Sequence, residues 1–124
     1  GTSETIIENI KIELIKAINK TENDLTENMS MYLSKKLNKE YSVLSKMFSQ
    51  VEGKTIEKYY IYLKIEKTKE LIQMNELNFS EIAYSLNYKS SSHLASQFKS
   101  VTGMSMGDYK KLQQWDRKPL DKIL

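Results

Sequence analysis

The sequence contains no cysteine, a single histidine, one proline and four glycines among its 124 residues. The lack of cysteine excludes disulfide bonds, thiolate metal sites and cysteine nucleophiles. Proline and glycine interrupt regular structure, so their scarcity favours helices over a loop-rich fold. Because the apolar residues recur at helical spacing almost throughout, we predict an all-α protein.

Long apolar runs are missing as well. No stretch approaches the ~18 residues that a membrane-spanning helix needs, and no signal-peptide pattern is present. We therefore expect a cytoplasmic protein with no membrane partner. The chain opens with Gly-Thr-Ser rather than methionine, and we expect it to be a fragment of a longer protein.

The side chains that most enzymes use are scarce. His93 is the only histidine, and we find no glycine-rich phosphate loop and no pair of carboxylates in a plausible cleft. An enzyme is therefore the weakest of the functional classes. We expect no catalytic residue, no cofactor and no metal site.

Charge is unevenly distributed along the chain. The net charge is +3, yet residues 1–28 hold three lysines against six acidic residues. Residues 29–124 hold sixteen basic residues against ten acidic ones. This moderate basic excess has the sign that attracts phosphate, although many proteins without a nucleic-acid partner reach it.

One segment of the sequence occurs twice. The matched pairs are Leu33/Ile82, Ser34/Ala83, Leu37/Leu86 and Asn38/Asn87 at an offset of 49, then Ser42/Ser92, Leu44/Leu94, Phe48/Phe98, Val51/Val101, Gly53/Gly103, Thr55/Ser105 and Tyr59/Tyr109 at an offset of 50. The offset changes by one residue in a turn, which a surface connection tolerates. Each copy consists of two short helices joined by a tight turn, so we predict two helix-turn-helix units.

Capping and termination signals place the helices. Thr5 and Glu8 form a capping-box pattern for an N-terminal helix that ends near Lys20. Further helices are expected to begin near residues 28, 40, 55, 78, 90 and 105, and the last to end at about residue 115. The residues expected to face inward on the second helix of each unit are Leu44, Met47, Phe48 and Val51, and Leu94, Phe98 and Val101.

The helix expected between residues 55 and 75 carries two apolar stripes. Ile61, Ile65, Thr68 and Ile72 form the first stripe, and Ile56, Tyr60, Leu63, Leu71 and Met74 form the second. The stripes are roughly 130° apart on a helical wheel. A helix with two apolar faces packs against two partners, so we expect this one to bridge the two copies of the repeat.

These residues resemble the AraC/XylS-type DNA-binding domain over about residues 25–112. The resemblance rests on LSKMF and VEGKTIEKY in the first copy, and on LKIEKTKELI, FSEIAYSLNY, HLASQFKSVTGMS and DY in the second. It implies two helix-turn-helix units, bridged by a helix, that read DNA from one face. The organisation expected is a connector at 1–24, a first unit at 25–54, a linker helix at 55–77, a second unit at 78–115 and a loose tail at 116–124.

Three positions depart from the family pattern. Family members usually have glycine where Asn87 stands, proline where Met106 stands and, often, arginine where Ser96 stands. Asparagine tolerates a left-handed turn, so we expect the fold to be preserved. The missing arginine is the larger loss, because bidentate arginine is the commonest specific contact to guanine.

The resemblance implies base contacts from the outward residues of both recognition helices. We predict Tyr41, Ser42, Ser45 and Lys46 in the first unit, and Ser91, Ser92, His93, Ala95 and Ser96 in the second. The predicted phosphate contacts are Ser49, Lys54, Lys89, Ser90, Lys99 and Lys110. His93 could equally be an ordinary surface residue. Any single lysine of this set could be a solvated surface charge without a DNA contact. Lys64, which matches a family arginine, is open to a structural or a DNA-binding role.

Two functions follow as hypotheses. In the first, the chain is the C-terminal domain of a larger regulator, binds double-stranded DNA sequence-specifically and contacts RNA polymerase if it activates transcription. Its effector-sensing domain is then missing from this fragment. In the alternative, the chain is a helical protein-interaction or dimerisation module with weak or non-specific DNA binding, and its N-terminal helix docks a partner.

Overall fold

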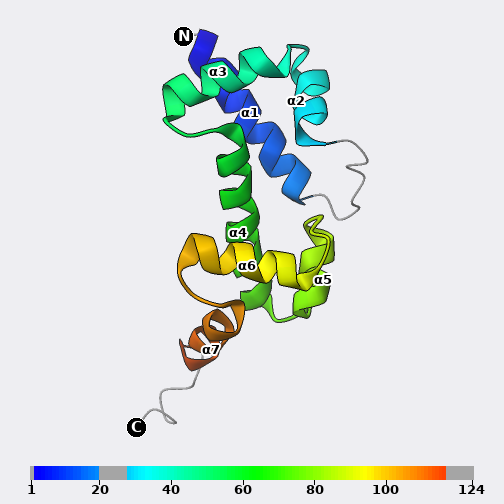
Figure 1. The fold of residues 1–124 in the computed structure, drawn as a ribbon, viewed down its shortest axis with the longest axis vertical. Helices are drawn as coiled ribbons and strands as arrows, with labels where there is room; N and C mark the ends of the chain where they lie inside the picture. Colours follow the sequence, from blue (N-terminus) through cyan, green and yellow to red (C-terminus); the bar gives the residue numbers. More distant parts are fainter. Residues whose placement is uncertain (1, 20–27, 117–124) are drawn as a thin grey trace. The chain divides into compact units, whose positions relative to one another are not determined.

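The computed structural model describes residues 2–19 and 28–116 (Figure 1). Seven α-helices and no strand make up this part, which confirms the all-α prediction. In chain order they are α1 (Thr2–Asn19), α2 (Met29–Leu37), α3 (Tyr41–Glu52), α4 (Ile56–Met74), α5 (Phe79–Ser85), α6 (Ser91–Thr102) and α7 (Met106–Asp116). None of these helices is long and apolar enough to cross a membrane.

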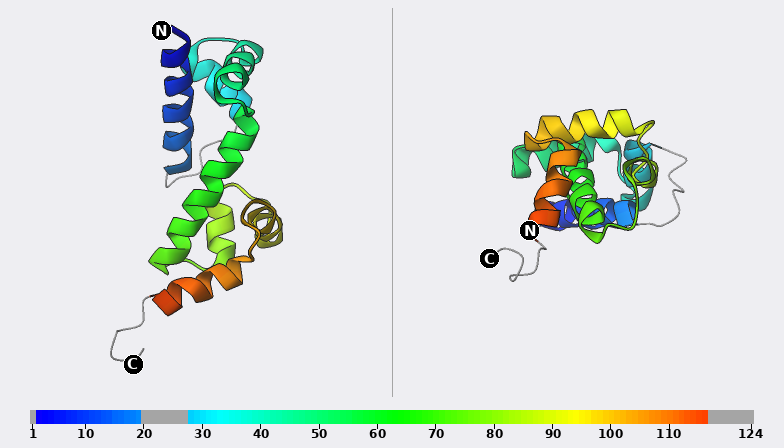
Figure 2. Two further views of the ribbon diagram at one scale, coloured as in Figure 1. Left: turned by 90° about the vertical axis from the view of Figure 1, so that its left-hand side faces the viewer. Right: turned by 90° about the horizontal axis from the view of Figure 1, so that it is seen from below.

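The chain divides into two compact units within α4. Unit 1 comprises residues 1–64 and unit 2 comprises residues 65–124. In the left-hand view of Figure 2, α4 is one continuous helix. Its first half supplies Ile56 to the core of unit 1, and its second half supplies Ile65 and Ile72, both buried, to unit 2. The expectation that this helix serves both copies is confirmed, except that Met74 is half exposed.

Unit 1 is built around the apolar face of α1. Ile7, Ile10 and Leu14 are almost completely buried, and α1 packs against both α2 and α3. From α2 and α3 the core receives Leu33 and Leu44. The apolar face of the N-terminal helix therefore forms part of the core of unit 1.

The start of α1 differs from the prediction. The helix already begins at Thr2, so Thr5 lies within it and does not occupy the capping position. Threonine followed three residues later by glutamate is typical of a capping box, but the same spacing also occurs inside helices. The pattern alone therefore could not fix where the helix begins. Lys20, where this helix is expected to end, residues 21–24 of the expected connector, and the tail from residue 117 lie outside the described residues.

The two copies of the repeat have the same local structure. Asn38 and Asn87 both adopt left-handed conformations, with φ of 52° and 65°, just after α2 and α5. Gly53 and Gly103 do the same after α3 and α6, with φ of 73° and 81°. Left-handed residues that end helices are usually glycine or asparagine, so the sequence repeat marks a structural repeat.

The turn of the second copy contains a buried aromatic residue. Tyr88 follows Asn87 in this turn and is only 4% exposed. The expectation that the extra residue of this turn lengthens a surface connection is therefore incomplete. The longer turn also places a side chain in the interior of unit 2.

We expect the Asn87→Ala substitution to lower the free energy of unfolding by about 1 kcal/mol. A residue with a Cβ atom in the left-handed region costs roughly 1–2 kcal/mol, and asparagine offsets part of that cost by local hydrogen bonding. Asn87→Gly should stay within about 0.5 kcal/mol of the unmodified protein. Chemical denaturation measures both changes. Lys89→Ala, at an exposed position of the same turn without a positive φ, is the control; an equal loss in the control would contradict the backbone explanation.

Candidate nucleic-acid interface

The face of α3 that points away from the core of unit 1 is polar and open to solvent. Leu44 and Phe48 are completely buried. Ser42 and Lys46 are exposed, and Ser45 is partly exposed. Successive residues of an α-helix are rotated by about 100° around its axis. Lys46 therefore points in the direction opposite to the midpoint of Leu44 and Phe48, at the centre of the exposed face. Three of the predicted base-contacting residues are therefore accessible.

Tyr41 lies at the edge of this face and is engaged within unit 1. Its ring packs against the core, and its hydroxyl group donates a hydrogen bond to the carboxylate of Glu57 on α4. Burial is the larger cause and this hydrogen bond the smaller one, and together they raise the pKa of Tyr41 well above its usual value. The same hydrogen bond lowers the pKa of Glu57. The phenol thus has an internal partner, and its stacking on a sugar or thymine methyl stays a prediction.

The corresponding face of α6 is also open. Ser90 caps this helix through its hydroxyl oxygen, which accepts a hydrogen bond of 3.1 Å from the backbone N–H of His93. Leu94 and Phe98 are completely buried, as their counterparts are in α3. Of the residues predicted to contact bases here, Ser92, His93, Ala95 and Ser96 are exposed and Ser91 is partly exposed.

His93 is held beside the turn that precedes α6. Its ring meets the ring of Tyr88 edge-on, with 5.2 Å between the centroids. The hydroxyl group of Tyr88 in turn hydrogen-bonds the side chain of Gln97 on α6. Buried Tyr88 therefore positions the exposed imidazole on the outer face of the helix. Its position is compatible with DNA contact and equally with a simple surface role.

The predicted phosphate contacts divide by accessibility. Lys54, Lys89, Ser90 and Lys99 are exposed, whereas Ser49 and Lys110 are partly exposed. The ammonium group of Lys54 lies 6.0 Å from the ring centroid of Tyr62, and that of Lys110 lies 5.7 Å from the ring of Phe79. Lysine side chains that rest on an aromatic ring keep the charge at the surface. Their contacts with phosphate stay predictions.

Lys64 differs from these lysines in its burial. Its ammonium group lies 4.9 Å from the ring centroid of Tyr60, and burial lowers its pKa. Of the two roles left open by the sequence, this position favours the structural one.

Two exposed residues of α3 were not singled out by the sequence analysis. Val43 and Gln50 lie on the same side of the helix as Lys46 and are both exposed. The signal was present in the sequence, because a helical wheel centred opposite Leu44 and Phe48 includes both positions. Valine was overlooked because an apolar side chain is ordinarily assigned to the core.

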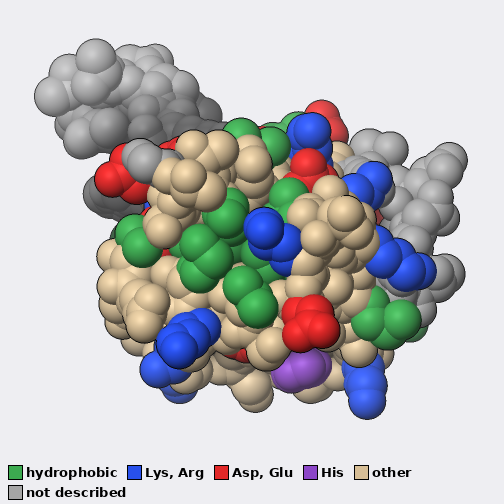
Figure 3. All heavy atoms as spheres, turned by 90° about the horizontal axis from the view of Figure 1, so that it is seen from above, with side chains coloured by type: hydrophobic (Ala, Val, Ile, Leu, Met, Phe, Trp, Pro, Cys, Tyr) green, Lys and Arg blue, Asp and Glu red, His purple; other side chains and the backbone are tan. Residues whose placement is uncertain are grey.

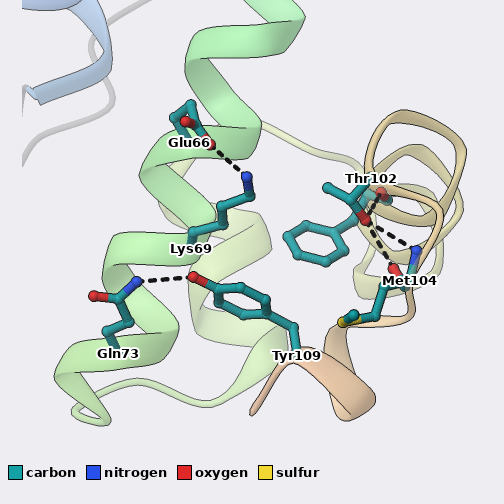
Figure 4. A network of polar contacts seen from close by, with 7 residues as sticks. Glu66, Lys69, Gln73, Thr102, Met104 and Tyr109 are labelled. Carbon is teal, nitrogen blue, oxygen red and sulfur yellow. Dashed lines mark hydrogen bonds and ion pairs between the residues drawn. The ribbon is translucent and has the colours of Figure 1, made fainter. Parts of the chain in front are cut away.

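The polar contacts within unit 2 hold α6 and α7 against α4 (Figure 4). The side-chain amide of Gln73 donates a hydrogen bond of 2.8 Å to the hydroxyl group of Tyr109. The ring of Tyr109 lies 5.7 Å from that of Phe98. In unit 1, Tyr59 makes the equivalent ring contact with Phe48 at 5.5 Å. The two tyrosines of the repeat therefore pack behind α3 and α6, against the buried phenylalanine of each helix.

Thr102 closes the end of α6. Its hydroxyl group donates to the backbone carbonyl oxygen of Phe98 at 2.8 Å and accepts from the backbone N–H of Met104 at 3.1 Å (Figure 4). A side chain that satisfies backbone groups at a helix end fixes where the helix stops. Together with left-handed Gly103, this contact sets the length of α6.

Charge is scattered on the one face that Figure 3 shows. On the face shown in Figure 3, the basic side chains stand apart among polar and hydrophobic ones and form no continuous patch. Within residues 2–19 and 28–116, no group of three or more side chains could hold a metal ion. The candidate site is therefore recognised by the two solvent-facing helices and by the repeat that places them.

The chain matches a known protein family over most of its length. A family model described as a helix-turn-helix domain matches residues 33–112, which is more than half of the chain. This range contains α3 and α6 and all of the candidate contacts. No curated protein sequence matches the chain.

Solved structures share the fold at low sequence identity. The C-terminal domain of AraT, a response regulator from Geobacillus stearothermophilus, superposes with a TM-score of 0.74 at 22% identity over 86% of this chain and 84% of that one. The DNA-binding domain of AdpA, a global transcriptional factor solved with a target DNA, gives a TM-score of 0.74 at 13% identity over 90% and 95%. A DNA-binding transcriptional dual regulator from Escherichia coli K-12 gives 0.70 at 18% identity over 86% and 93%.

Proposed function

The chain belongs to the AraC-type helix-turn-helix family, and we propose that it regulates transcription by binding double-stranded DNA sequence-specifically through α3 and α6. This family consists of transcription factors and not of enzymes. The single observation that carries the proposal is that α3 and α6 share the same arrangement of buried, terminating and exposed residues. Each is fixed from behind by a buried leucine and phenylalanine, ends at a left-handed glycine and exposes small polar residues on its outer face.

The proposed mechanism places both helices in the major groove. A helix of this motif lies in the major groove and reads base edges with its outward side chains, while neighbouring lysines and backbone N–H groups hold the phosphates. In α3, Ser42 and Lys46 provide hydroxyl and ammonium groups for base edges. In α6, Ser92 and Ser96 supply hydroxyl groups and Ala95 a methyl group. Recognition helices of this class occupy successive major grooves about 34 Å apart, so the domain would bind an asymmetric site as a monomer.

The proposal extends to the protein's wider setting. We place this chain at the C-terminal end of a larger cytoplasmic regulator in which a separate domain senses an effector. Two similar structures support this placement by analogy, since the AraT domain and the domain of yesN from Fusobacterium nucleatum are both C-terminal domains of response regulators. If the protein activates transcription, RNA polymerase is its second partner.

Selection from a pool of random duplexes at about physiological salt tests the proposal. Two enriched submotifs separated by about one helical turn are the expected result, because each recognition helix should contribute one. A single enriched submotif would limit base recognition to one unit. A pool with no enrichment would overturn sequence-specific binding and leave the interaction-module hypothesis.

The Lys46→Ala substitution should weaken binding to the selected duplex about 5-fold to 100-fold and relax the preference at one or two base pairs. A lysine at the centre of the exposed face is placed to donate to guanine O6 and N7, and alanine cannot. Fluorescence anisotropy and a repeated selection measure the two effects. Lys16→Ala, on α1 and 65% exposed in its side chain, is the matched control; an unchanged preference in Lys46→Ala would refute base recognition by this lysine.

The interaction-module hypothesis has less surface available than the sequence suggested. It relied on the apolar face of the N-terminal helix, and that face is buried against α2 and α3. Deleting this helix would therefore remove part of the core of unit 1 and would not be a clean test. Among the large apolar residues of α1, Ile12 and Ile15 remain 44% exposed, and Ile12→Glu with Ile15→Glu is the sharper test of a docking role.

A further inference from the structure

The exposed face of α3 carries two side chains whose chemistry matches an adenine–thymine pair. Val43 is 45% exposed and Gln50 is exposed, and both flank Lys46 on the side opposite Leu44 and Phe48. Seven residues along a helix turn through nearly two full turns, so Val43 and Gln50 share one side and differ by about 20°. They form one continuous strip with Lys46 between them.

Val43 has no evident role in the fold. It lies outside the core cluster of unit 1, and a β-branched residue lowers helix propensity compared with an unbranched one. The corresponding position in α6 is His93, so the repeated architecture does not require an apolar side chain there. A local choice that disfavours the helix without improving the packing is typical of a functional position.

The chemistry of the major groove fits both side chains. The C5 methyl group of thymine is the apolar group that base pairs present there, and apolar side chains contact it. Adenine presents the N7 acceptor and the N6 donor, which a glutamine amide can bind with two hydrogen bonds. Neither side chain complements the two acceptors of guanine as well as arginine does, and neither recognition helix contains an arginine.

The spacing agrees with successive base pairs. Seven residues of helix rise by about 10.5 Å, and three base-pair steps of B-form DNA rise by about 10 Å. The two side chains can therefore reach different base pairs of one half-site when the helix lies along the groove. On α6 the matching positions hold His93 and Ser100, which lack this pair of groups.

We propose that Val43 and Gln50 add two base contacts to the sequence preference of the first unit, Val43 by contacting a thymine methyl group and Gln50 by binding adenine. This inference rests on the proposed function, since it names the bases that the same surface reads. The preference of the first half-site is then for adenine and thymine at the positions that these residues face.

The first experiment combines protein and base changes at the Val43 contact. In the selected duplex, each thymine is replaced in turn by deoxyuridine, which removes only the C5 methyl group, and affinity is measured by fluorescence anisotropy at fixed salt. For the unmodified protein we expect a loss of about fourfold at one position of the first half-site, the size of one buried methyl group. Val43→Ala should bind both duplexes equally at that position. Val43→Thr, which retains one methyl group, should keep part of the difference.

The second experiment treats Gln50 in the same way. Replacing each adenine by 7-deazaadenine removes the N7 acceptor, and one position should cost the unmodified protein at least about fivefold in affinity. Gln50→Ala should lose this sensitivity. The exposed Gln114 on α7 is the matched glutamine, and Gln114→Ala should retain it.

Val51→Ala is the control for the valine experiment. Val51 lies on the same helix and is 51% exposed, but it is on the side toward Leu44 and Phe48. This variant should show the full deoxyuridine penalty. Thermal unfolding by circular dichroism checks that each variant remains as folded as the unmodified protein.

The outcomes separate the two proposals. An enriched motif together with base sensitivities that persist in Val43→Ala and Gln50→Ala would overturn this inference and leave the proposed function intact. Loss of the sensitivity in only one variant would reject the role of the other residue. A pool without any enrichment would overturn the proposed function and this inference with it.

Discussion

Replacing Phe48 by alanine is expected to lower the free energy of unfolding of unit 1 by about 3–5 kcal/mol, the usual cost of removing a buried phenylalanine. Phe48 is completely buried, and its ring packs against Tyr59. Because small domains are stable by only about 5–15 kcal/mol, this loss removes much of the available stability. Amide hydrogen exchange of α2 and α3 measures it, and we expect the protection of both helices to fall sharply.

Phe98→Ala is the matched variant for unit 2. Phe98 is also completely buried and packs against Tyr109, so the protection of α5 and α6 should fall by a similar factor. Val51→Ala, at a half-exposed position on α3, should change stability by less than about 1 kcal/mol. A Phe48 variant as stable as the Val51 variant would contradict the assignment of Phe48 to the core.

Raising the salt concentration from 50 to 200 mM should weaken DNA binding roughly 150-fold. Binding that displaces counterions from phosphates falls with salt at a logarithmic slope of about −0.9 for each phosphate neutralised. The four lysines predicted to contact phosphate therefore give a slope of about −3.6. They are Lys54, Lys89, Lys99 and Lys110. Anisotropy titrations at several salt concentrations measure the slope directly.

Single substitutions show which lysines contribute to this slope. Lys89→Ala should reduce its magnitude by about 0.9, because one phosphate contact is lost. Lys16→Ala on α1 should leave it unchanged. A slope near zero, or one that Lys89→Ala and the other three lysine variants do not alter, would show that phosphate contacts do not drive binding.

The parts of the fold that the sequence predicted well depend on neighbouring residues along the chain. Ser90 and Asn78 cap helices by bonding backbone groups three residues away, and Asn87 and Gly103 end helices through their own φ angles. Such features depend only on residues a few positions apart, so the local sequence is sufficient to predict them. The helix boundaries after residue 28 were accordingly predicted within one or two residues.

The predictions that failed required knowledge of distant neighbours. Val51 and Val101 were expected to face inward, yet they are 51% and 47% exposed. A helical wheel gives the direction of a side chain, but it does not say whether another element covers the last turn of the helix. The burial of Tyr88 in a turn and the inclusion of α1 in the core of unit 1 were missed for the same reason.

The candidate site could be predicted in outline from the sequence. The outward faces of α3 and α6 follow from the positions of Leu44, Phe48, Leu94 and Phe98, since every other side chain of a helix is placed once the buried ones are known. The internal partner of Tyr41 could not be predicted, because Glu57 lies sixteen residues further along the chain, on another helix. Which of the accessible side chains touch DNA stays a prediction.

The division of the chain inside α4 has a consequence for how this domain is inherited. The boundary between Lys64 and Ile65 lies within an unbroken helix. The first half of the helix completes one core with Ile56, and the second half supplies Ile65 and Ile72 to the other. A recombination event at the boundary would give each product half a helix and an unfinished interior. The two units can therefore be gained or lost in evolution only as a pair.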